Sequence, residues 1–227
     1  MSEHFKTVGR PEKKVDGLAL VRGKPVYTPD YDAPDALVVK LLRSPHAHAQ
    51  IKSIDTGQAE AINDVVGIFT FKDIDRIPFT RAGQGYPEPS PYDTYLLDSK
   101  VRYVGDVVAV VAAKNEKAAR EAMKNIKVEY EILDPVFDMR EASNEGAPVI
   151  HDEDDCSGVF DKSRNIAAHF VMDIGDVEKT LENCDFVLRK TYHVDTQLHA
   201  ALEPHNALTY FDSVGRLIVV SSTQVPF

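Results

Sequence analysis

The chain has 227 residues, of which 43% are hydrophobic, and a formal net charge of −10 at pH 7. This length suits one large or two small globular domains. Because basic residues are scattered, the sequence offers no basic patch for nucleic acid or for an anionic membrane surface. No apolar run approaches the roughly 20 residues that span a bilayer, and residues 1–17 are too polar for a signal-peptide core. We therefore expect a cytoplasmic protein.

The first half of the chain predicts a series of strands. Apolar runs or alternating patterns occur at residues 36–42, 50–56 and 65–70. Residues 80–97 are crowded with Gly and Pro and predict a long irregular loop. Residues 135–168 are acidic and turn-rich, with little periodicity, and are interpreted as an extended connector.

The clearest unit lies between this loop and the connector. Residues 106–113 form a continuous apolar run typical of a buried strand, and Asn115 stands where a helix N-cap is expected. A helical stripe of apolar residues follows, made of Ala118, Ala119, Ala122, Met123 and Ile126. Residues 127–133 then alternate like a half-buried strand. Strand, helix and strand in succession predict a βαβ unit with two parallel strands.

The last third of the chain predicts a second, smaller region. Asp176 is a candidate N-cap for a short helix, and residues 186–194 resume strand character. Residues 207–211 and 216–222 predict a hairpin whose second strand is the more apolar and therefore central. About 55 residues are too few to give such a strand a core of their own. We therefore expect this region to be the beginning of a larger domain.

Histidines give two candidate metal sites, neither of them complete. His46 and His48 would share one face of a strand, but no carboxylate or cysteine stands nearby to complete a site. His199, Glu203 and His205 form a His/Glu/His cluster without a third anchoring ligand on a neighbouring strand. Neither group is expected to bind a metal, and ordinary structural roles are the preferred interpretation.

Other motifs for catalysis are weak or missing. The Gly-Gln-Gly at residues 83–85 lacks the following helix of a phosphate-binding loop, and no Gly-x-Ser-x-Gly nucleophile motif is present. Cys156 and Cys184 are far apart and lack a Cys-x-x-Cys spacing, so neither a disulfide nor a zinc site is expected. An iron–sulfur cluster normally takes four cysteine ligands, so the chain cannot hold one alone.

Four sequence blocks nevertheless resemble a known family, in the family's order. They read "VGRPEKKVDGLALVRGKPVYTPDY", "LLRSPHAHAQIKSIDTGQA", "VRYVGDVVAVVAAKNEKAAREAMKNIKVEYEIL" and "LHAALEPHNALTYFDSVGRLIVVSSTQVPF". Together they are similar to the molybdopterin-binding subunit of the xanthine dehydrogenase and aldehyde oxidase family. The resemblance implies an α+β protein, with an α/β-hammerhead domain at residues 1–134, an acidic connector at 135–164 and the beginning of the molybdenum cofactor domain at 165–227.

The resemblance also implies site residues. The glutamine of "STQ", Gln224, would donate its side-chain amide to an oxo ligand of the molybdenum, and Glu203 in "LEPH" would support the same site from further away. No catalytic residue is expected within these residues, because the family's general base lies further along its sequence. These 227 residues alone are therefore expected to be inactive.

The implied activity is hydroxylation of xanthine or a related N-heterocycle with oxygen derived from water. Electrons would pass to [2Fe–2S] clusters and FAD on an iron–sulfur subunit and a FAD-binding subunit, and a homodimer is allowed. Similar sequences act on aldehydes, nicotinate, carbon monoxide or aryl-CoA thioesters, and these remain alternatives. The alternative from another functional class is a hammerhead-type binding or assembly module that does not bind molybdenum.

Overall fold

The computed structural model describes residues 7–24, 27–81 and 90–223. The chain divides into two compact units. One consists of Asp35–Val187, and the other combines Met1–Pro34 with Leu188–Phe227. The N-terminal residues therefore belong to the same unit as the last 40 residues of the chain.

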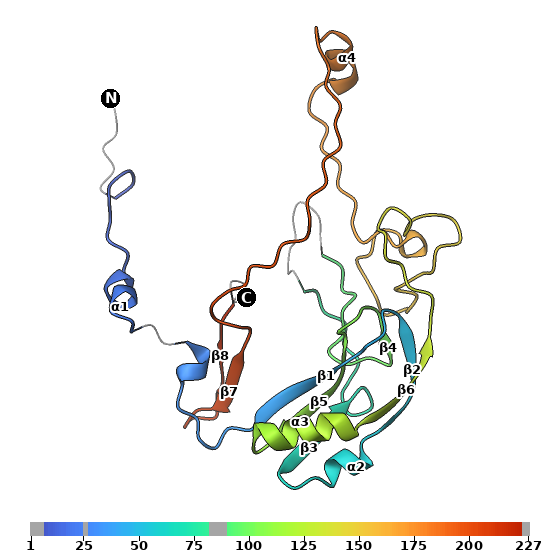
Figure 1. Ribbon diagram of the computed structural model, residues 1–227. Helices are drawn as coiled ribbons and strands as arrows, with labels where there is room; N and C mark the ends of the chain where they lie inside the picture. The colour runs from blue at the N-terminus through green and yellow to red at the C-terminus, as the bar shows by residue number, and fades with distance from the viewer. Residues whose placement is uncertain (1–6, 25–26, 82–89, 224–227) are drawn as a thin grey trace. The chain divides into compact units, whose positions relative to one another are not determined.

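The unit at Asp35–Val187 is built on two three-stranded antiparallel sheets with helices packed beside them (Figure 1). The first sheet has the order β1-β5-β3, formed by Val38–Arg43, Val107–Ala113 and Val65–Thr70. The second has the order β4-β2-β6, formed by Lys100–Val101, Ala49–Asp55 and Lys127–Ile132. The helices beside the first sheet are α2, Gly57–Glu60, and α3, Glu116–Asn125.

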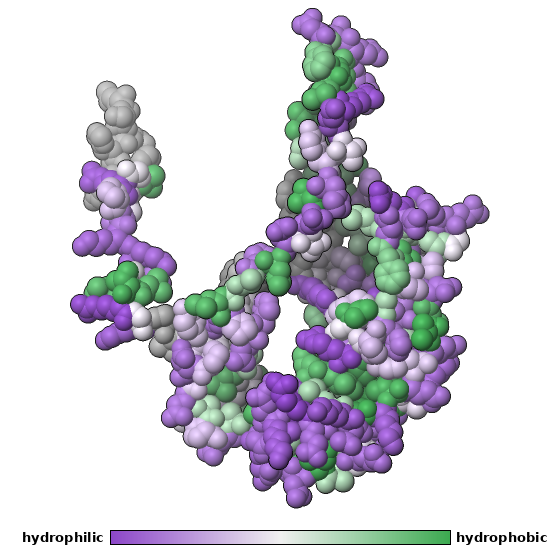
Figure 2. Space-filling view, viewed as in Figure 1, coloured by the Kyte–Doolittle hydropathy of each residue, from purple (hydrophilic) through white to green (hydrophobic). Residues whose placement is uncertain are grey.

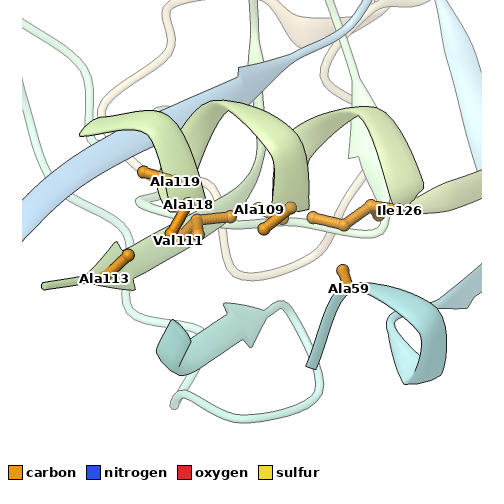
Figure 3. Packing of buried hydrophobic residues seen from close by; sticks show 8 residues of the cluster. Ala59, Ala109, Val111, Ala113, Ala118, Ala119 and Ile126 are labelled. Carbon is orange, nitrogen blue, oxygen red and sulfur yellow. The ribbon is translucent and has the colours of Figure 1, made fainter. Parts of the chain in front are cut away.

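Helix α3 confirms the prediction made from its sequence. The Asn115 side chain accepts a hydrogen bond of 2.9 Å from the backbone N–H of Ala118, as an N-cap does. The apolar stripe of α3 then packs on β5 and α2 in the main core (Figure 3). The buried members of this core are Ala59, Ala109, Val111, Ala113, Ala118, Ala119, Ala122 and Ile126.

The predicted parallel βαβ unit is wrong, although its three elements exist. β5 is already paired on both edges, antiparallel to β1 and to β3, so it has no free edge for β6. β6 instead pairs antiparallel with β2 in the second sheet. A strand-helix-strand pattern gives the order of elements but not which strand each one will pair with, because pairing depends on strands far away in the sequence.

The acidic region after β6 carries little regular structure but is held against the rest of its unit. Its one short helix is the 3₁₀ turn η2, Lys162–Arg164. Asn165 adopts a left-handed backbone conformation after this turn. Its side-chain amide donates to the carbonyls of Ala142 and Pro148 and accepts from the N–H of Ile150, each at 2.9 Å. One asparagine thus ties together three points of an otherwise irregular segment.

Helix α4, Val177–Glu182, follows this region and has no buried residue. Asp176 caps it as predicted, accepting a hydrogen bond of 3.0 Å from the N–H of Lys179. Figure 2 shows green apolar side chains among the purple polar ones around α4. Val177 is 55% exposed and Phe186 is 78% exposed.

The second unit contains α1, Gly17–Val21, the 3₁₀ turn η1, Thr28–Asp30, and the hairpin of β7, Ala207–Phe211, and β8, Leu217–Ser221. The hairpin was predicted and is confirmed. The strand predicted at residues 186–194 is wrong, because this stretch pairs with no other strand in the described chain. β8 was predicted to be central, but among the described residues it pairs only with β7, and its Leu217 and Val219 are more than half exposed.

The N-cap of α3 gives a stability prediction. Asn115→Ala removes the cap and also the 3.0 Å hydrogen bond from Asn115 Nδ2 to Asp64 Oδ2. We expect it to lower the free energy of unfolding by about 1 kcal/mol, measured by urea denaturation. The matched control is Asp176→Ala, which removes the N-cap of a helix that buries no residue, and it should leave unfolding unchanged. Equal losses in both variants would contradict the assignment of α3 to the core.

The difference in pairing and burial between strands β5 and β8 gives a second prediction. β5 is paired on both edges and largely buried, whereas β8 is paired on one edge and alternates between exposed and half-buried residues. In monomeric protein we expect the amides of residues 107–112 to exchange far more slowly with deuterium than those of 217–221. Equal protection of the two stretches would show that the hairpin is more stable than its packing indicates.

Candidate functional site

The most buried polar cluster in the Asp35–Val187 unit surrounds the guanidinium of Arg102. Arg102 makes ion pairs of 2.8 Å with Asp98 and with Glu153. All three side chains are about nine-tenths buried. Asp98 lies on the same stretch of chain as Arg102, whereas Glu153 comes from the acidic region 51 residues later. The buried cation therefore holds the acidic region against the sheets.

A second arginine extends the cluster toward solvent. The Arg76 guanidinium lies over the Tyr95 ring, 3.7 Å from its centroid, and pairs with Asp98 at 2.9 Å. Arg76 also pairs with Asp155, and the Tyr95 hydroxyl donates to the same carboxylate at 3.0 Å. Lys100 adds a third link, pairing with Asp152 at 2.6 Å. Residues 152–155 are thus anchored at three carboxylates.

The cluster shifts the pKa values of its members in directions set by burial and charge. Burial alone would raise the pKa of the Glu153 carboxyl, but hydrogen bonds from His151 and the backbone, together with Arg102, hold that pKa well below its ordinary value. Burial and the hydrogen bond to Asp155 raise the pKa of the Tyr95 hydroxyl. Burial, reinforced by the charge of Glu153, raises the pKa of the Cys156 thiol.

Three possible metal ligands meet at the edge of this cluster. One donor atom each of His151, Glu153 and Cys156 lies within 4.8 Å of the other two, and within the described chain this is the only group of three or more such residues. His151 Nδ1 contacts Glu153 Oε1 at 2.9 Å, while Glu153 Oε2 is buried without a hydrogen-bond partner. The expectation of no zinc site rested on the spacing of the two cysteines alone and did not include this grouping. The available signal was the His-x-Glu-x-x-Cys spacing.

A pocket of about 270 Å³ lies beside the cluster. Arg81, Lys100 and Arg102 supply its positive charges, and each of them already has a partner. Lys100 and Arg102 are ion-paired, and Arg81 donates to the Tyr103 hydroxyl at 2.5 Å. Carboxylates neutralise Lys100 and Arg102, whereas Arg81 has a neutral partner and keeps its positive charge at the pocket.

The predicted pair His46 and His48 does not form a metal site in the structure. His48 is buried and donates from Nδ1 to the carbonyl of Asp134 at 2.8 Å. The His46 ring instead stands edge-on to Tyr130, with ring centroids 4.9 Å apart. The two imidazoles thus make different contacts, and neither belongs to the group of three possible ligands described above.

Glu203 has a structural contact within the second unit. Its Oε1 accepts a hydrogen bond of 2.9 Å from the backbone N–H of Thr28, a buried residue that begins η1. The described residues do not bring His199, Glu203 and His205 together as a metal-ligand group. The role of Glu203 near the cofactor stays a prediction. Gln224 and the Gly-Gln-Gly at 83–85 lie outside the described residues.

Two family models match the chain in consecutive segments. Residues 22–134 match the aldehyde oxidase and xanthine dehydrogenase a/b hammerhead domain, and residues 159–227 match the molybdopterin cofactor-binding domain. The chain belongs to the aldehyde oxidase and xanthine dehydrogenase family. The predicted α+β fold class, a hammerhead domain followed by the start of a molybdenum cofactor domain, is thereby confirmed.

Relatives from several bacteria match nearly the whole chain. The "Probable hypoxanthine oxidase XdhD" of Escherichia coli K12 is 37% identical over 99% of this chain and 26% of its own length. The nicotinate dehydrogenase large molybdopterin subunit of Eubacterium barkeri is 34% identical over the whole chain and 49% of its own length. Among solved structures, the aldehyde oxidoreductase of Desulfovibrio gigas superposes with a TM-score of 0.73 at 25% identity, over 91% of this chain and 23% of its own.

The chain thus spans between 23% and 49% of the length of these relatives. In the described part of the chain, no helix has the length and apolar character needed to cross a membrane.

The matched family binds molybdopterin, so we asked whether the described residues could hold it. A pterin site needs buried, converging polar groups around a concave surface. None of the described residues from 157 to 223 is buried, and Glu203 is engaged with the backbone of Thr28. The described residues from 157 to 223 therefore do not form such a site by themselves.

The Arg102 cluster gives a third prediction. Arg102→Ala leaves the buried carboxylate of Glu153 without its cation, while Asp98 keeps its ion pair with Arg76. We expect it to lower the free energy of unfolding of this unit by about 3 kcal/mol, measured by urea denaturation. The control is Arg140→Ala, which breaks an exposed pair with Asp138 and should leave stability unchanged. If Arg102→Ala is as mild as the control, the acidic region is held by other contacts.

Proposed function

We propose that this chain is part of the catalytic subunit of a molybdenum hydroxylase that oxidises xanthine or a related N-heterocycle with oxygen derived from water. The observation that carries the proposal is the match to the hammerhead model followed by the match to the molybdopterin model. The N-heterocyclic substrate is supported by the names of the relatives, which include a hypoxanthine oxidase and a nicotinate dehydrogenase. The cytoplasmic location expected from the composition stays a prediction.

The electron acceptors in this proposal lie outside these 227 residues. A [2Fe–2S] cluster takes four cysteine ligands, and this chain has two cysteines, of which Cys156 is buried and Cys184 exposed. We propose an iron–sulfur subunit and a FAD-binding subunit as partners, as the family resemblance implies. A homodimer of the catalytic subunit is compatible with this arrangement.

Gln224 is proposed as the residue of this chain that touches the cofactor. Its place in the "STQ" of the fourth sequence block supports this role. A primary amide suits an oxo ligand because it donates a hydrogen bond without adding a negative charge or a competing ligand. The chemistry of hydroxylation would be supplied by the molybdenum cofactor when bound. Gln224 would orient that group and stabilise its charge.

The fourth prediction tests this role in the assembled, fully metallated enzyme. A hydrogen bond to a charged oxygen is worth about 1.5 to 3 kcal/mol, so Gln224→Ala should lower kcat roughly 10- to 200-fold. Gln224→Glu should be worse, because it sets an ionised carboxylate beside an oxygen of like charge. The measurement is dye reduction with xanthine, hypoxanthine and nicotinate, alongside molybdenum content.

Gln197→Ala is the matched control. Gln197 is an exposed amide that donates to the carbonyl of Asp195 at 3.2 Å, so its loss should cost much less activity. Equal and negligible losses for both glutamines at full metal content would contradict the role of Gln224. A fully metallated enzyme that oxidises none of the three N-heterocycles would contradict the proposed substrate class but not the family.

A further inference from the structure

We propose that His151, Glu153 and Cys156 form a binding site for a single Zn²⁺ ion. The observation is the meeting of three chemically different donors, an imidazole, a carboxylate and a thiol, within 4.8 Å of one another. This mixture of nitrogen, oxygen and sulfur is what Zn²⁺ accepts, whereas Ca²⁺ and Mg²⁺ prefer oxygen alone. The site belongs to the Asp35–Val187 unit, and it rests neither on the molybdenum cofactor nor on the proposed oxidation.

The bonding around Glu153 leaves one of its oxygens available for a metal. Oε1 is occupied, because it accepts from Arg102 Nη2 at 2.8 Å and contacts His151 Nδ1 at 2.9 Å. Oε2 is buried and has no hydrogen-bond partner. A buried acceptor without a partner carries a desolvation cost that a bound cation would remove. Metal binding through Oε2 can therefore keep the Arg102 ion pair intact.

The other two donors need only small adjustments. His151 carries its proton on Nδ1 while it bonds Glu153, so metal binding moves that proton to Nε2 and frees the Nδ1 lone pair. Cys156 is buried and not in a disulfide, and it gives up its thiol proton on coordination. With three protein ligands, a fourth tetrahedral position remains for water.

The local charge favours a cation despite the nearby arginine. The ion pairs of Arg102 with Asp98 and Glu153 already balance its charge. Besides Glu153, the residues Asp152, Asp154 and Asp155 add three carboxylates next to the site. Of these, Asp152 and Asp155 are paired with Lys100 and Arg76. The surroundings of the proposed Zn²⁺ site therefore carry no net positive charge.

The test uses the purified full chain in metal-free buffer. Equilibrium dialysis against Zn²⁺ should give one bound ion per chain. Co²⁺ in the same site should show a thiolate-to-cobalt charge-transfer absorption, which reports sulfur coordination directly. We expect Cys156→Ser to abolish that absorption and to weaken Zn²⁺ binding at least about 10-fold. His151→Ala should weaken binding by a similar factor.

Matched controls separate this site from the chain's other possible ligands. Cys184→Ser removes the exposed cysteine, and His193→Ala removes an exposed histidine that pairs with Asp195 at 3.1 Å. Both should leave the Zn²⁺ affinity and the Co²⁺ spectrum unchanged. Because Cys156 is buried, circular dichroism must show that its variant is folded. If the Cys156 variant is not folded, the Zn²⁺ affinity of His151→Ala decides the test, because His151 is more exposed than Cys156.

Three results would overturn the proposal. They are failure of the wild-type chain to bind Zn²⁺, a Co²⁺ spectrum without the sulfur absorption, and binding that survives unchanged in His151→Ala. None of them bears on the molybdenum hydroxylase function, which is judged by the activity of the assembled enzyme.

Discussion

A buried guanidinium is the constraint on which the larger unit depends. Arg102 lies next to β4 with about a tenth of its side chain exposed, so its charge must be neutralised by carboxylates that are also out of water. Asp98 supplies one locally, but Glu153 has to be brought from a distant part of the chain. The irregular region after β6 is therefore fixed in space by charge rather than by a hydrophobic core. Cys156, which is 6% exposed, is its only buried residue beyond position 150 in the described chain.

The elements that the sequence predicts well are those with local signals. The strands at β1, β2 and β3 follow from apolar runs or alternation, and α3 follows from its stripe and from Asn115 at its N-cap. These signals act within a few residues, so they survive in any tertiary context. Strand partners are different. The parallel pairing expected for β5 and β6 failed because β5 uses both edges for β1 and β3, which no feature of the intervening helix reveals.

The same distinction explains the candidate sites. In the sequence, Arg76, Arg102 and Glu153 look like separate solvated surface charges, because they are far apart. Arg102 follows Arg76 by 26 residues, and Glu153 follows Arg102 by 51. Only the fold shows that they share one buried cluster, whereas the His-x-Glu-x-x-Cys spacing of His151, Glu153 and Cys156 is visible in the sequence. The molybdenum site is the opposite case. Its candidate residues come from resemblance to a family, because neither Glu203 nor its neighbours have a spacing that predicts a pterin.

The contact of Glu203 with Thr28 gives that resemblance a physical meaning. Thr28 lies in the first of the four family-like blocks and Glu203 in the last, 175 residues apart, yet one hydrogen bond of 2.9 Å joins them in the same compact unit. A carboxylate that satisfies a backbone N–H at the start of η1 holds the two ends of the matched region together. Such a contact requires both blocks to be present and in place. Their joint occurrence in the sequence is therefore what a shared fold demands.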